Sequence, residues 1–154
     1  MNSCKESSKT SVKQNIKDSI VSFKFKPPKK IISLPVKYRI RNNMFSWLEF
    51  GVFIDGFENF TKLNQQGNLV FIKDLETKAM TLSKSNYPKH IDLPDIRSRL
   101  KVVQTILMQC RFHSENKNWE ELDSSLQNLH ISYNSFISRI KSVNDEIILF
   151  KVKD

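Results

Sequence analysis

Glycine, cysteine and proline are scarce in this chain, whose 154 residues include three Gly, two Cys and five Pro. Proteins built from hairpins and tight turns usually need more glycine and proline, so the composition favours helices. Cys4 lies in a polar stretch and Cys110 on an apolar stripe, which indicates free thiols in a reducing compartment. No apolar run approaches the roughly 18 residues of a membrane span. The first residues lack the apolar segment of a secretory signal, so we expect no such signal here.

Residues that catalyse reactions or bind metals are also few. The three histidines, His90, His113 and His130, are not spaced with one another, with cysteine or with acids as metal ligands require. We interpret them as surface or helix-capping side chains. The motifs of phosphate loops, dinucleotide sites, serine hydrolases and zinc proteases are missing. The sequence therefore predicts a non-enzymatic protein with no cofactor, no metal and no evident small-molecule ligand.

Positive charge is concentrated in the first quarter of the chain. Residues 1–41 contain eleven Lys and Arg and two acidic residues, which accounts for the whole formal net charge of +9. Residues 42–154 are electrically neutral. We therefore divide the chain into a basic arm, 1–41, that is extended or largely disordered, and an α-helical domain, 42–154.

The second half of the arm is expected to be extended. Phe23 and Phe25 alternate with lysines, and Pro27 and Pro28 interrupt any helix. Cations release counterions from a phosphate backbone, and aromatic rings stack on unpaired bases. The arm is thus predicted to contact nucleic acid. The alternatives are contact with an acidic protein, or a solubilising tail that binds no ligand. The basic run in the arm is also typical of a nuclear-import signal. The candidate nucleic-acid-binding residues are Lys24, Lys26, Lys29, Lys30, Lys37, Arg39 and Arg41.

The C-terminal third has the clearest helical pattern. Apolar residues recur at spacings of three and four from Trp119 to Ile147, which predicts one helix of about 30 residues. Asn118 and Glu121 form a capping box, which also explains the acidic cluster of Glu120, Glu121 and Asp123. A helix over 95–113, with Asp92 as its cap and Pro94 in its first turn, precedes it. The short link 114–117 makes these two helices antiparallel neighbours.

The region 44–83 permits two interpretations. The spacing of its apolar residues predicts helices over about 44–63 and 68–83 that complete a four-helix bundle. The alternative is a β-hairpin formed by 50–54 and 69–73, which share aromatic and β-branched residues. Most of the aromatic cluster is expected in the core, but its density suggests that some rings anchor a partner. The candidate partner-binding residues are Trp47, Phe53, Tyr133, Phe136 and Ile140.

Residues 97–129 resemble a tetratricopeptide-type helical hairpin. The stretch Leu107–His113 stands where the first helix of such a hairpin ends, and Asn118–Leu122 resembles the turn and the start of the second. Leu126 and Leu129 occupy its packing positions. Such hairpins occur in the helical-repeat subunit of the RNA polymerase I core initiation factor, so the resemblance implies a role in transcription. No functional residue is carried over from it.

These patterns together predict a mainly α protein, a helical bundle with a long C-terminal amphipathic helix and an extended basic N-terminal arm. We expect a nuclear interaction subunit of a nucleic-acid-associated complex. Its helical body would dock on other protein subunits while the arm contacts nucleic acid. The alternative is a structural coiled-coil adaptor without nucleic-acid contact, and the alternative location is cytoplasmic.

Overall fold

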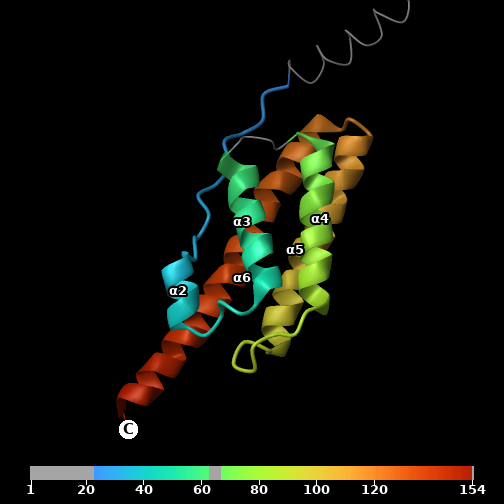
Figure 1. Ribbon diagram of the computed structural model, residues 1–154. Helices are drawn as coiled ribbons and strands as arrows, with labels where there is room; N and C mark the ends of the chain where they lie inside the picture. The colour runs from blue at the N-terminus through green and yellow to red at the C-terminus, as the bar shows by residue number, and fades with distance from the viewer. Residues whose placement is uncertain (1–22, 63–66, 154) are drawn as a thin grey trace, which may run out of the picture.

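The computed structural model describes residues 23–62 and 67–153. Within these two ranges there is no strand, so the predicted mainly α fold is confirmed and the hairpin alternative for residues 44–83 is wrong. Figure 1 shows the long helix α6 running the length of the molecule beside the shorter helices. The helices are α2 (Val36–Arg41), α3 (Leu48–Lys62), α4 (Leu69–Lys84), α5 (Pro94–Glu115) and α6 (Trp119–Lys153).

The four longer helices form a bundle in sequence order. The backbone of α3 lies close to that of α4, α4 lies close to α5, and α5 lies close to α6. In contrast, α3 meets α6 through large side chains: the rings of Phe57 and Tyr133 stack with centroids 3.8 Å apart. Phe50 and Phe53 reach Phe136 in the same seam, at 6.2 and 6.4 Å. The aromatic residues of α3 therefore fill the space between the first and last helices of the bundle.

Two turns with the same geometry end α2 and α5. After α2, the N–H groups of Asn43 and Met44 donate to the carbonyls of Ile40 and Arg39, and Asn43 has a φ of 55°. These bonds make a Schellman motif, in which a left-handed residue closes the helix. Lys117 has the same φ after α5, where N–H groups of residues 117 and 118 bind back into the last turn. The prediction that residues 36–41 are extended is therefore wrong, and α3 begins at residue 48 rather than 44.

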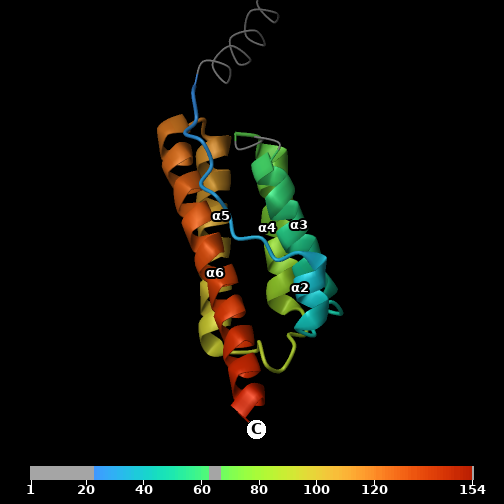
Figure 2. The ribbon, with the colours of Figure 1, turned by 90° about the vertical axis from the view of Figure 1, so that its left-hand side faces the viewer.

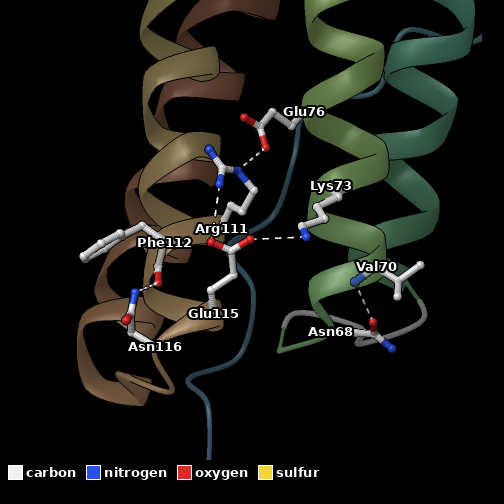
Figure 3. A network of polar contacts seen from close by, with 8 residues as sticks. All are labelled: Asn68, Val70, Lys73, Glu76, Arg111, Phe112, Glu115 and Asn116. Atoms are coloured by element: carbon white, nitrogen blue, oxygen red, sulfur yellow. Dashed lines mark hydrogen bonds and ion pairs between the residues drawn. The ribbon is translucent and has the colours of Figure 1, made fainter.

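Polar side chains at helix ends partly follow the predicted pattern. Pro94 is the first residue of α5 as expected, but Asp92 does not cap that helix. Its carboxylate accepts a hydrogen bond from Arg97 Nε at 2.6 Å instead. The side chain of Asn68 caps α4, and ion pairs of Arg111 with Glu76 and of Lys73 with Glu115 join α4 to α5 (Figure 3). Among the residues that the structure covers, none of the helices combines the length and apolarity of a membrane span.

Candidate nucleic-acid interface

Residues 23–35, called the strap from here on, run extended along the seam between α6 and α3 (Figure 2). Side chains of α6 hold its backbone. Asp123 Oδ1 accepts from the N–H of Lys26 at 2.9 Å, and Asn134 Oδ1 accepts from the N–H of Ile32 at 2.8 Å. Gln127 Nε2 also donates to the carbonyl of residue 27 at 3.3 Å. An extended segment without a partner strand needs other partners for its peptide groups, and these α6 side chains supply several of them.

Apolar side chains fix the strap to the bundle as well. Leu34 is buried in the core, and Ile31 and Ile32 pack against it. Phe25 contacts the edge of Trp119 with ring centroids 6.4 Å apart. It also covers Gly67, where an added Cβ would lie 2.9 Å from the Phe25 ring. The ring of Phe25 is thus engaged in packing, whereas the sequence suggested that it would stack on bases.

Six of the seven predicted nucleic-acid-binding side chains extend into solvent. Residues 23–41 contain no acidic residue. Within the described ranges, only Lys26 of the six has an ion-pair partner, the buried Asp123, with 3.9 Å between Nζ and Oδ2. The geometry therefore combines an anchored backbone with a row of outward cations. The six exposed residues are Lys24, Lys26, Lys29, Lys30, Lys37 and Arg41.

Arg39 is the exception, and its predicted role needs correction. It is only 8% exposed, and its Nη2 lies 3.4 Å from Asp55 Oδ1 on α3. A Cβ added at Gly51 would lie 2.6 Å from Arg39 Nη1, so the guanidinium occupies the space that this glycine leaves. Arg39 joins α2 to α3 and does not belong to the exposed row.

The five predicted partner-binding residues are corrected together, because all of them lie inside the bundle. Trp47, Phe53, Tyr133, Phe136 and Ile140 are each 3% exposed or less. The physical reason is that α3 supplies the apolar cover that the second half of α6 requires. The indole of Trp47 stacks on Phe50 at 4.7 Å and donates to Ser85 Oγ at 2.8 Å, which places it between α3 and the end of α4.

His130 was predicted to be a surface or helix-capping side chain, but it is fully buried within α6. Its Nδ1 lies 2.6 Å from the carbonyl oxygen of Leu126. Because a carbonyl only accepts, Nδ1 carries the proton, and the buried Nε2 has no hydrogen-bond partner. Burial lowers the pKa of His130, and the positive charge of Lys29 on the strap lowers it further. In contrast, His113 lies in the last turn of α5, as predicted.

The polar anchors of the strap were missed by sequence reasoning. Asp123 was interpreted as part of an acidic cluster at the helix cap, and no role was assigned to Gln127 or Asn134. Their spacing of four and seven places them on one flank of α6, beside its apolar stripe. Polar residues on this flank are a signal that amphipathic helices in general share, so it does not identify the strap as their partner.

Burial raises the pKa of the Cys110 thiol to about 12, so this cysteine is an inert core residue. Within residues 23–62 and 67–153, no group of three His, Cys, Asp or Glu side chains is placed to bind a metal ion.

No protein-family model, no curated protein and no solved structure matches this chain.

Proposed function

We propose that this protein is a non-enzymatic interaction subunit of a nuclear, nucleic-acid-associated complex, and that transcription is the process it serves. In this proposal the helical bundle is a rigid support, and the exposed cations of the strap and α2 contact phosphate groups. The single observation that carries the proposal is that α6 fixes the strap backbone while the lysine side chains extend outward.

An anchored cationic segment is better suited to bind a polyanion than a free one. Binding a free segment would require its backbone to be ordered, at about 1–2 kcal/mol per residue in conformational entropy. The hydrogen bonds from Asp123 and Asn134 already order the strap backbone when the protein folds, so binding loses less conformational entropy. Because lysine side chains contact phosphate groups rather than base edges, we expect binding that depends on salt and only weakly on sequence.

Charge substitution tests this proposal better than truncation. Removing residues 1–41 would also remove Leu34 and Arg39, which are buried against the bundle, so a loss of binding would be ambiguous. We therefore choose K24Q/K26Q/K29Q/K30Q, and measure binding of a fluorescently labelled single-stranded oligonucleotide by anisotropy. We expect this variant to bind at least tenfold more weakly than the unmodified chain, with unchanged helicity by circular dichroism.

The matched control removes the same charge elsewhere. Lys84, Lys89, Lys101 and Lys141 are exposed and have no ion-pair partner within the described ranges. The variant K84Q/K89Q/K101Q/K141Q is expected to retain most of the affinity. An equal loss of oligonucleotide affinity in the two variants would mean that only the net charge of the protein matters, and would contradict the proposal. Affinity capture from nuclear extract, with and without nuclease, then tests membership of a nucleic-acid-associated complex.

One observation favours the coiled-coil adaptor as a second candidate function. At the end of α6, Leu149, Phe150 and Val152 are 65%, 73% and 80% exposed. Figure 1 shows this end of α6 extending past α2, away from the other long helices. Pairing with another chain is thus restricted to these last turns, because α6 is covered as far as Val143. Sedimentation at increasing concentration tests it: a monomer throughout would exclude self-pairing.

A further inference from the structure

A cavity of about 220 Å³ lies where the end of α2 approaches the C-terminal part of α6. Three cationic or ionisable side chains from separate parts of the chain line it. They are Arg41 at the end of α2, His90 in the connection between α4 and α5, and Lys151 on α6. Asn43 and Asn144 also line the cavity, and no acidic residue of the described ranges does.

Within the described ranges, neither Arg41 nor Lys151 forms an ion pair. Arg41 is the one arginine in the described ranges whose side chain has no hydrogen-bonded oxygen; its guanidinium instead lies 5.8 Å from the Tyr38 ring. The other five arginines each bind a side-chain oxygen: Arg39 on Asp55, Arg97 on Asp92, Arg99 on Ser135, Arg111 on Glu76 and Arg139 on Asp95.

We propose that this cavity binds a phosphate monoester. A guanidinium presents paired N–H donors that match two oxygens of one phosphate, and an ammonium group adds a compact charge. The cavity is smaller than the roughly 300–1,000 Å³ of sites for drug-sized ligands, which suits one small anion. The terminal phosphate of a nucleic-acid strand is the source we favour, and this choice of source rests on the proposed function. Arg41 lines the cavity and is the last residue of α2, the helix that directly follows the strap with its exposed cations.

Two titrations test the cavity and its ligand source separately. In the first, inorganic phosphate is added to the ¹⁵N-labelled full chain. We expect saturable shifts of the amide signals of Asn43 and Ile148. In the R41Q/K151Q variant we expect binding to weaken by about tenfold or more, the scale of one lost charge-assisted hydrogen bond. The control K141Q removes an exposed α6 charge outside the cavity and should bind as the unmodified chain does.

In the second titration, oligonucleotides with a 5′-phosphate and a 5′-hydroxyl are compared. Tighter binding of the phosphorylated strand, lost in R41Q/K151Q, assigns the cavity to strand ends. Saturable binding of inorganic phosphate with equal affinity for both strands assigns it to a free phosphate ester instead. No saturable shift with phosphate and no difference between the strands overturns the cavity proposal. The K24Q/K26Q/K29Q/K30Q variant separates the two proposals, since it should still bind inorganic phosphate even if strand binding fails.

Discussion

The side chain of Asn134 holds the strap at Ile32, accepting its backbone N–H at 2.8 Å through Oδ1. The same amide donates through Nδ2 to the carbonyl of Lys30 at 2.9 Å. One side chain of α6 therefore satisfies peptide groups on both sides of Ile31. Because this contact uses the strap backbone, it leaves the lysine side chains of the strap unoccupied; within the described ranges only Lys26 among them has an ion-pair partner, Asp123.

Substituting Asn134 with Ala is expected to loosen the strap. Two hydrogen bonds are lost, so the free energy of unfolding should fall by about 1–3 kcal/mol. Hydrogen exchange at the Ile32 amide should also become faster. The measurement is native-state exchange followed by mass spectrometry or NMR, together with urea unfolding. Asn128 is exposed on the same helix, so N128A is the control. Unchanged exchange at Ile32 in N134A would mean that this bond does not hold the strap.

The buried stripe of α6 can be tested with two identical substitutions on one helix. Leu126 is fully buried, whereas Leu149 is 65% exposed. We expect L126A to lower the free energy of unfolding by about 2–5 kcal/mol, because it removes buried methyl groups and leaves a cavity. L149A should change it by less than about 0.5 kcal/mol. Chemical denaturation of both variants measures the difference, and similar costs would contradict the assigned burial.

Buried His130 should make stability depend on pH. Its pKa in the folded protein lies below the ordinary value of 6.5, mainly because burial disfavours the charged form. The unfolded chain therefore binds the proton more readily, so stability falls as the pH is lowered from about 6.5 toward the folded-state pKa. We expect H130L to flatten the change in unfolding free energy between about pH 7 and pH 5. Identical pH profiles for H130L and the unmodified chain would refute this.

Cys110 should be unreactive in the folded protein. With its pKa raised to about 12, only about one thiol in ten thousand is ionised at pH 8, and the side chain is fully buried. In a C4S variant, where Cys110 is the one remaining thiol, we expect almost no reaction with a thiol reagent under native conditions. Complete reaction should follow in denaturant. Rapid native labelling would show that α5 opens readily around this residue.

The spacing of apolar residues predicted the bundle because the residues that recur every three or four positions, such as Leu126 and Ile140, are the ones that are fully buried. The apolar stripe on α3 was equally clear in the sequence, yet some of its aromatic residues were predicted to bind a partner protein. Spacing alone does not specify which surface covers an apolar stripe. Phe57 and Tyr133 lie 76 positions apart in sequence, and only the fold brings their rings into a stack at 3.8 Å.

The extended, basic character of the strap could be predicted from the sequence, but its place on the bundle could not. Its charge, prolines and alternating phenylalanines indicated an extended basic segment, as found for residues 23–35. The bonds of Lys26 to Asp123 and of Ile32 to Asn134 join residues about 100 positions apart. No local pattern specifies such pairs. Arg39 was grouped with the exposed cations for the same reason, since the space at Gly51 that receives it depends on packing of α2 against α3.

The salt dependence of oligonucleotide binding tests the central claim, that the anchored strap presents its lysines to phosphate groups. For single strands the slope of log K against log salt is about −0.7 for each phosphate that a protein neutralises. K24Q/K26Q/K29Q/K30Q should therefore reduce the steepness of this slope by up to about 3, whereas K84Q/K89Q/K101Q/K141Q should leave it nearly unchanged. The same slope for both variants would contradict the assignment of the strap as the nucleic-acid interface.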